Sequence, residues 1–277
     1  MKRKVLSVFI FLATIALITV PLLMLTSAAD TDTVSVTASV QNVAPTITYV
    51  QTGASATPSG GTTKEIQIRF NATDSNSVDD FADATAQVNI TNAAVTLTSH
   101  ACAASGLTGT MESWLCNITI NYYQVPAAWS VTAYIADSAG NNDTDTSATF
   151  TINNLDSVAV TQASMAFTGT PGQTNVASDP SPIAVTNTGN QNYATVGVTA
   201  HDLSGGGDTI PATAFNVNIS DSSDGQALAD GSPVQVTGST LARGAGATRN
   251  LYFYLDIPSG IVNASYSSAA WTFDPTV

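Results

Sequence analysis

The chain has few of the residues on which nucleic-acid binding and most catalysis depend. Its 277 residues include 7 Lys or Arg and 2 His, and three of the basic residues lie within the first four positions. Twenty Asp or Glu lie beyond Ala29, where four Lys or Arg remain, so that part carries a formal charge of −16. Phosphate backbones are bound through Lys and Arg, so this composition excludes nucleic acid as a partner.

Sequence motifs of common enzyme classes are also missing. The chain contains no Gly-x-Ser-x-Gly, no His-Glu-x-x-His and no glycine-rich phosphate loop. The two glutamates are Glu65 and Glu112, and Glu65 lies on the outward phase of a predicted strand, where a general-acid pair is hard to assemble. His100 and His201 are expected to be ordinary loop or strand-end residues. We therefore predict a non-enzymatic protein without a cofactor, apart from the calcium considered below.

The N-terminus has the three parts of an export signal. Basic residues at positions 2–4 precede an apolar run over 5–25, and Ser27 and Ala29 suit the small-residue positions of a cleavage site. We predict that residues 1–29 are a cleaved signal peptide. The alternative is an uncleaved N-terminal membrane anchor, because the run holds 21 uncharged residues and ~20 span a bilayer. In both cases the rest of the chain is extracellular or at the cell surface, and only the apolar run contacts the membrane.

Beyond the signal, composition and patterning favour strands. Ser, Thr, Val and Ile are abundant, and no later stretch shows a sustained helical period of apolar residues. Alternating apolar positions predict short strands in residues 30–154 and a second set in residues 155–277, joined at the polar segment Asn153–Asp156. We predict an all-β chain of two tandem immunoglobulin-like β-sandwiches after an N-terminal signal or anchor helix.

Two sets of residues carry a resemblance to known families. Trp129–Asn141 (WSVTAYIADSAGN) resembles the late strand and turn of bacterial and archaeal immunoglobulin-like domains, and the resemblance covers residues 44–154. The Trp-Asp-Phe-Gly-Asp signature of polycystic-kidney-disease repeats is absent. In the second half, Asn187–Asn190, Tyr252–Gly260 and Tyr266 look like accessory sandwich domains of prokaryotic surface proteins. The resemblance implies sandwich folds and a spacer or stalk role.

The two cysteines are Cys102 and Cys116. An even pair in an exported chain predicts a disulfide. The alternative is a metal site that starts at His100 and Cys102, but such a site needs more ligands than the sequence provides.

Two acidic loops stand out in the first half, over Asp74–Asp80 and Asp137–Asp143. The loops after the second and sixth strands of an immunoglobulin-like sandwich lie at the same end. Oxygen ligands that meet there suit Ca²⁺, which takes ~6–8 of them. The candidate ligands are Asp74, Asn76, Asp79, Asp137, Asn141 and Asp143. Neither loop matches an EF-hand, and the alternative is that Asp and Asn only form the turns.

The chain also contains sequons for N-glycosylation. They begin at Asn71, Asn89, Asn117, Asn142, Asn218 and Asn263. Their number is that expected by chance for a chain rich in Asn, Ser and Thr, so only their placement is informative. The first three and Asn218 fall on the outward phase of predicted strands, where a glycan fits. The alternative is that these are ordinary polar residues of the solvent face.

One further segment has a distinctive pattern. Val34, Val36, Ala38 and Val40 alternate with polar residues just after the predicted cleavage site, which predicts a half-buried strand over Thr33–Val40. The pattern resembles the donor strands of chaperone-assembled pilins and of archaeal thread filaments, which fill a groove in the next subunit. We expect the segment to pair within its own domain, and donation is the alternative.

These features predict a structural or adhesive protein of a prokaryotic cell surface: a stalk, an envelope component or a filament subunit. Its expected partners are other surface proteins, copies of itself or glycans. The alternative is a carbohydrate- or protein-binding module, stabilised by calcium if the acidic loops hold an ion. Trp114, Tyr122 and Tyr123 are the candidates for an exposed aromatic sugar platform, whereas Trp129 is expected in the core.

Overall fold

The computed structural model describes residues 34–277 except 94 and 101. The predicted signal or anchor, residues 1–29, lies outside the described residues. The chain divides into two units, Met1–Gln41 and Asn42–Val277. In the part of the chain that is described, no helix has the length and apolar character needed to cross a bilayer.

The described chain is built from strands, and the all-β prediction is confirmed. Its helical elements are three single 3-10 turns, η1 (Val78–Asp80), η2 (Asp83–Thr85) and η3 (Ala212–Ala214). The strands of the first half are β1 (Thr46–Thr52), β2 (Ser55–Ala56), β3 (Thr63–Thr73), β4 (Gln87–Asn92), β5 (Val95–Thr98), β6 (Ala103–Thr108), β7 (Met111–Asn121), β8 (Ala127–Ala136), β9 (Asn142–Asp145) and β10 (Thr149–Ile152).

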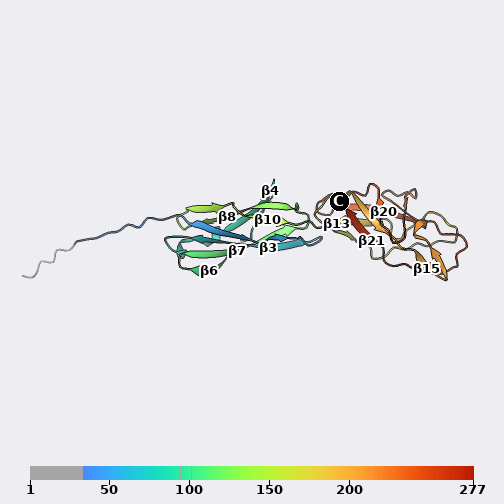
Figure 1. Cartoon of the computed structure of the whole chain (residues 1–277), viewed down its shortest axis with the longest axis horizontal. Coiled ribbons are helices and arrows are strands. Elements are labelled where there is room, and N and C mark those ends of the chain that lie inside the picture. The colour runs from blue at the N-terminus through green and yellow to red at the C-terminus, as the bar shows by residue number, and fades with distance from the viewer. Residues whose placement is uncertain (1–33, 94, 101) are drawn as a thin grey trace, which may run out of the picture. The chain divides into compact units, whose positions relative to one another are not determined.

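These strands form two sheets that face each other across one core. One sheet has the order β1-β3-β7-β6, and the other has the order β2-β10-β8-β4-β5 with β9 paired to β8. Figure 1 shows β3, β6 and β7 in one layer and β4, β8 and β10 in the other. The longest pairing is antiparallel, between β3 and β7, and runs from Thr63 opposite Asn121 to Thr73 opposite Met111.

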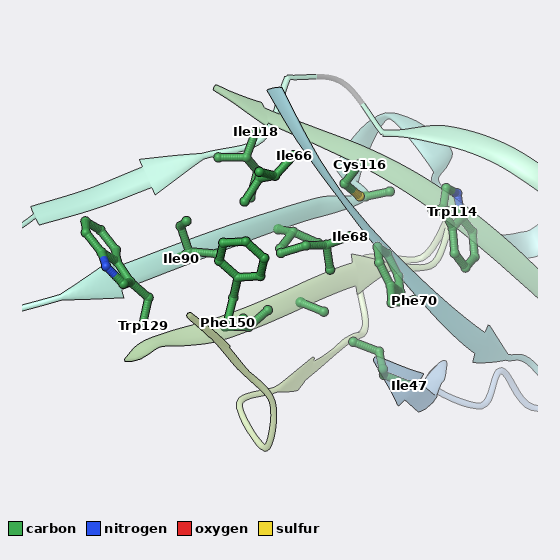
Figure 2. Close-up of a cluster of buried hydrophobic side chains, with 14 of the residues drawn as sticks. Ile47, Ile66, Ile68, Phe70, Ile90, Trp114, Cys116, Ile118, Trp129 and Phe150 are labelled. Atoms are coloured by element: carbon green, nitrogen blue, oxygen red, sulfur yellow. The ribbon is translucent and has the colours of Figure 1, made fainter. Parts of the chain in front are cut away.

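Alternation along each strand sends one face into the core. On β3 the side chains of Ile66, Ile68 and Phe70 are buried, while Gln67 and Arg69 are exposed. β4, β7, β8 and β10 follow the same period and supply most of the rest of the first core cluster. Figure 2 shows this cluster. Each large side chain that is fully buried contributes roughly 1.5–3 kcal/mol of transfer free energy, so this period fixes the register of both sheets.

The second half repeats this plan with shorter strands. They are β11 (Val158–Val160), β12 (Val176–Ala177), β13 (Ile183–Asn187), β14 (Thr195–Thr199), β15 (Leu203–Gly205), β16 (Asp208–Ile210), β17 (Phe215–Asn218), β18 (Gln226–Ala227), β19 (Val234–Val236), β20 (Thr248–Leu255) and β21 (Thr272–Thr276). A sheet of order β11-β13-β20-β17-β18, with β12 paired to β20, and a sheet of order β19-β14-β21 enclose a second core. The pair β15-β16 stands apart from both sheets.

The segment between the two cores is held by side-chain amides. The backbone N–H of Leu155 donates to Asn190 Oδ1 at 2.7 Å, and Asn190 Nδ2 donates to the Asn153 carbonyl at 2.9 Å. Asn190 is fully buried, so the Asn187–Asn190 turn has a structural role here. The two cores lie on either side of the predicted boundary between residues 154 and 155, which stays a prediction because both belong to one compact unit.

Of the strand predicted over Thr33–Val40, the described residues 34–40 form no strand. Residues 34–45 carry no strand, and Val34, Val36 and Val40 are exposed at 83%, 85% and 86%. Alternation gives a segment one apolar face, but it provides no sheet edge to cover that face. A smaller difference lies in β5, where Val95 is exposed because β5 ends its sheet.

Candidate functional site

The two acidic loops meet at one end of the first core. Asp74 directly follows β3, Asp80 ends the turn η1, and Asp137 directly follows β8. Each of the three offers a carboxylate oxygen, and these oxygens all lie within 4.8 Å of one another. The loop backbones are joined as well, because the Ser138 N–H donates to the Asp80 carbonyl at 2.7 Å. The predicted pair of loops therefore forms one cluster of carboxylates.

Asp74 is the most deeply buried member of this cluster. Its side chain is 1% exposed. One oxygen, Oδ1, accepts the Asn76 backbone N–H at 2.8 Å. The other oxygen, Oδ2, is buried and has no hydrogen-bond partner among the described residues. A buried carboxylate oxygen without a partner is costly, so this atom favours a donor or a cation beyond those that the described residues supply.

Asp137 organises the second loop. Its Oδ1 accepts the backbone N–H groups of Ala139 at 2.9 Å and Asn141 at 2.8 Å. Its Oδ2 accepts the side-chain amides of Asn141 at 2.9 Å and Asn42 at 2.8 Å. Burial acts to raise the pKa of Asp137, but the hydrogen bonds from Asn141, Asn42 and Ala139 outweigh it and hold the pKa below its usual value. This carboxylate is therefore negatively charged at neutral pH.

Gly140 permits the tight turn that brings these donors to Asp137. Its φ of 88° lies in the left-handed region, which a residue with a Cβ adopts only at a cost. The Gly140 N–H also donates to the Asp137 carbonyl at 3.1 Å. The Asp-Ser-Ala-Gly-Asn sequence thus forms a turn whose N–H groups donate to the carboxylate of its first residue, Asp137.

The remaining predicted ligands are divided between the cluster and its supports. Asn141 contacts Asp137 directly, as described above. Asn76 Oδ1 accepts the Val43 N–H at 2.8 Å, and Asp143 Oδ2 accepts the Ile47 N–H at 2.7 Å, so both tie the first residues of the compact unit to the loops. Asp79 does not belong to the cluster, and its neighbour Asp80 does. Consecutive side chains of a 3-10 turn point about 120° apart, so only one of the two faces Asp74.

Sequence reasoning gave no role in this cluster to Glu112. It lies on β7 with the same inward phase as Trp114 and Cys116, and it is buried. Burial, followed by the charges of Asp83 and Asp79, raises the pKa of Glu112. The period of two on β7 is the signal that places this carboxylate on the inner face, next to the acidic loops.

The predicted disulfide is present. Cys102 and Cys116 are bonded, and the described residues include no free cysteine. Cys116 is fully buried at the centre of β7, and Cys102 lies just before β6 and packs against the same core. The bond therefore fastens the start of the edge strand β6 to its neighbour β7.

The aromatic platform predicted around Trp114 is not formed, and the expectation that Trp114 is exposed is wrong. Trp114 is fully buried, stacks on Phe70 with ring centroids 5.0 Å apart, and meets Phe81 edge to face. Figure 2 shows Trp114 beside Phe70 at one end of the cluster and Trp129 at the other. Trp129 is buried as expected, and its Nε1–H donates to the Val125 carbonyl at 3.0 Å.

The two tyrosines of that prediction do not form a flat surface either. Tyr122 and Tyr123 are half-buried and meet edge to face at 5.1 Å. The Tyr122 hydroxyl accepts the Gly246 N–H at 3.0 Å. Sugar rings stack on an open aromatic face, and this pair presents no common face.

The six sequons lie in two kinds of environment. Asn142 and Asn263 are exposed, while the other four asparagines are half-buried on their strands. Among these, Asn218 Nδ2 donates to the Ser222 and Asp224 carbonyls at 3.4 and 3.3 Å. The Oδ1 atoms of Asn89 and Asn117 are buried without a partner among the described residues. Glycosylation stays a prediction, and the two exposed positions offer the most space for a glycan.

An aromatic cavity in the second half was not foreseen from the sequence. It has a volume of about 380 Å³ and lies between the segment 160–167 and the segment 266–273. Phe167, Phe215, Tyr266 and Trp271 are among the residues that line it. Phe215 meets both Phe167 and Trp271 edge to face. No pattern marks this site in advance, because its two walls are irregular segments about 100 residues apart in the chain.

The histidines make local contacts. His201 Nδ1 lies 3.6 Å from Asp230 Oδ1, and His100 Nε2 lies 3.0 Å from Thr119 Oγ1. Both are the loop or strand-end residues that the sequence led us to expect.

Comparison with known proteins adds little. No described protein family matches the chain, and no curated protein matches it. Among solved structures, it aligns with the secreted serine protease VesC from Vibrio cholerae at 11% identity and a TM-score of 0.22. The alignment covers 83% of this chain and 51% of that protein, so the chain spans about half the length of VesC. A likeness at this level carries no argument about function.

Proposed function

We propose that this chain is a non-enzymatic structural or adhesive component of a prokaryotic cell surface, exported by its N-terminal segment. Its two cores are proposed to be two tandem immunoglobulin-like sandwiches, one within residues 30–154 and one within 155–277. Two pairs of facing sheets, one disulfide and a surface poor in basic groups support this proposal. Rigid modules of this kind serve as spacers, stalks or filament subunits.

The observation that carries the proposal is the exposed segment 34–40. Val34, Val36 and Val40 are each more than four-fifths exposed, although their alternation is that of a strand with one buried face. An apolar strand without a cover adds readily to the sheet edge of another molecule. The exposure therefore favours donation of this segment over pairing within its own domain. The proposed recipient is a second copy of the chain or another surface protein.

Deletion of residues 30–41 tests this role. Because the segment buries little surface, the truncated chain is expected to stay folded, with a Tm within about 2 °C of the parent. It should fail to polymerise, and a synthetic 30–41 peptide should bind to it. A peptide with Ser in place of Val34, Val36 and Val40 is the matched control and should not bind. A truncated chain that loses stability and ignores the peptide would contradict strand donation.

A second candidate, a binding module, is favoured by the aromatic cavity. A volume of about 380 Å³ lies within the ~300–1,000 Å³ typical of small-ligand sites. If the intact chain binds a glycan or a peptide, Trp271→Ala should abolish that binding. Tyr49→Ala, at an exposed aromatic outside the cavity, should leave the binding unchanged. If no glycan or peptide binds to the intact chain, the cavity is only a packing defect.

A further inference from the structure

We propose that Asp74, Asp80 and Asp137 form a Ca²⁺ site at the acidic end of the first core, and that the ion locks residues 42–47 onto that end. We call residues 42–47 the entry segment, because they are the first residues of the compact unit Asn42–Val277. This inference goes beyond the proposed surface role, and only the affinity expected for the ion rests on that role.

The first argument is the unsatisfied oxygen of Asp74. A side chain that is 1% exposed holds a carboxylate oxygen, Oδ2, without a hydrogen-bond partner among the described residues. Its other oxygen already accepts the Asn76 N–H. Native proteins rarely leave such an atom unpaired, and a bound ion is a common partner for one. Asp74 belongs to the three-carboxylate cluster, and a cation bound there is the partner that we propose for this oxygen.

The second argument is uncompensated charge. Three carboxylates from three separate positions approach within 4.8 Å, and like charges at this distance repel strongly in a partly buried setting. In the described part of the chain the one ion pair is between His201 and Asp230, so no Lys or Arg side chain is paired with this cluster. A bound divalent cation removes this repulsion.

The donor set selects the ion. The group contains carboxylates and no His or Cys, which favours a hard cation such as Ca²⁺, Mg²⁺ or Mn²⁺. Two amides also face Asp137, since Asn42 Nδ2 and Asn141 Nδ2 both donate to its Oδ2. Rotation of each side-chain amide by about 180° places its oxygen where its nitrogen now lies. The two rotated amides together supply two neutral oxygen ligands. Five side-chain oxygens, completed by water, suit the ~6–8 ligands of Ca²⁺ better than the six-ligand octahedron of Mg²⁺.

The same residues hold the entry segment. Asn42 bonds to Asp137, the Val43 N–H bonds to Asn76, and the Ile47 N–H bonds to Asp143. All three acceptors lie in the two acidic loops. An ion that joins the loops therefore also fixes the point at which the chain enters its folded unit. For a chain that is proposed to be extracellular, only modest affinity is required, because extracellular calcium modules bind with Kd of ~10⁻⁴–10⁻³ M.

Calorimetric titration of the full-length, chelator-treated chain with CaCl₂ tests the site. We expect about one ion per chain with a Kd of roughly 10⁻⁴–10⁻³ M, and binding to MgCl₂ weaker by about tenfold or more. Asp80→Asn, at a half-buried position that tolerates an amide, should weaken Ca²⁺ binding by about tenfold or more. Asp79→Asn removes the same charge next to it, outside the cluster, and should leave binding within about twofold. Circular dichroism should show both variants folded.

Hydrogen exchange tests the coupling to the entry segment. In the parent chain, millimolar Ca²⁺ should slow exchange of the Val43 and Ile47 amides by about tenfold, and in Asp80→Asn it should not. No binding at millimolar Ca²⁺, or equal losses in Asp79→Asn and Asp80→Asn, would overturn the site. Binding without any change at these two amides would overturn the coupling. If Asp80→Asn fails to fold, Asn141→Ala takes its place, because Asn141 is exposed and its loss removes one oxygen ligand.

Discussion

Removal of the disulfide should destabilise the first core and leave the second unchanged. The variant is Cys102→Ala with Cys116→Ala, because serine at the buried position 116 would place a hydroxyl in the core. The two cysteines are 14 positions apart, and a loop of this length lowers the entropy of the unfolded chain by an amount worth about 3 kcal/mol at 25 °C. Cys116 is fully buried, so loss of its sulfur adds about 1 kcal/mol.

Differential scanning calorimetry measures this effect for each core. A domain of about 100 residues loses roughly 4–8 °C of Tm for each kcal/mol. We therefore expect the transition of the first core to fall by roughly 15–30 °C. The transition of the second core is the internal control, because its cluster contains neither cysteine. Reduction of the parent chain with a thiol should reproduce most of the shift, since it removes the same cross-link.

Two results would refute this reasoning. An unchanged Tm in the double variant would mean that the cross-link does not restrict the unfolded chain as the loop length requires. A single transition that moves as a whole would mean that the two cores unfold as one cooperative unit, against the predicted boundary at residues 154 and 155.

Two further predictions concern buried side chains of the first core. Trp129→Ala should lower the free energy of unfolding by about 3–5 kcal/mol in denaturant titration, because the indole is fully buried; Tyr49→Ala, at an exposed aromatic, should change it by less than about 0.5 kcal/mol. Glu112→Gln should raise Tm at pH 7. The pKa of Glu112 is raised in the folded chain, so its protonated form favours folding below pH ~4.5, and that contribution is lost as pH rises through the folded pKa. The advantage of Glu112→Gln should vanish on acidification, and an advantage that persists at pH 3 would show that charge is not its cause.

The strands and the core of this protein are largely readable from its sequence. A period of two is a local property, so Ile66, Ile68 and Phe70 could be assigned to the inner face of one strand without knowledge of its neighbours. The same rule places Trp129 in the core. The rule also places Trp114 on the inner face, so the expectation of an exposed platform at Trp114 was wrong.

The acidic site was readable only in part. The Asp-rich loops were visible, and the expected sandwich topology placed them at the same end. The choice of Asp80 over Asp79 depends on the direction of side chains in one 3-10 turn, which spacing alone does not give. The contribution of Asn42 depends on a hydrogen bond to a residue 95 positions away. Neither a turn direction nor a contact of that range leaves a pattern in the sequence.

Local sequence was enough to predict the strand character, the inward face of most strands and the pairing of the only two cysteines. Each follows from backbone geometry or from counting, without reference to distant parts of the chain. The tertiary structure decided which apolar faces are covered. Val34, Val36 and Val40 have the same alternation as buried strands and remain exposed. The physical reason is that a strand buries its apolar face only where another segment supplies a sheet edge and a facing layer, and that partner is a property of the whole fold.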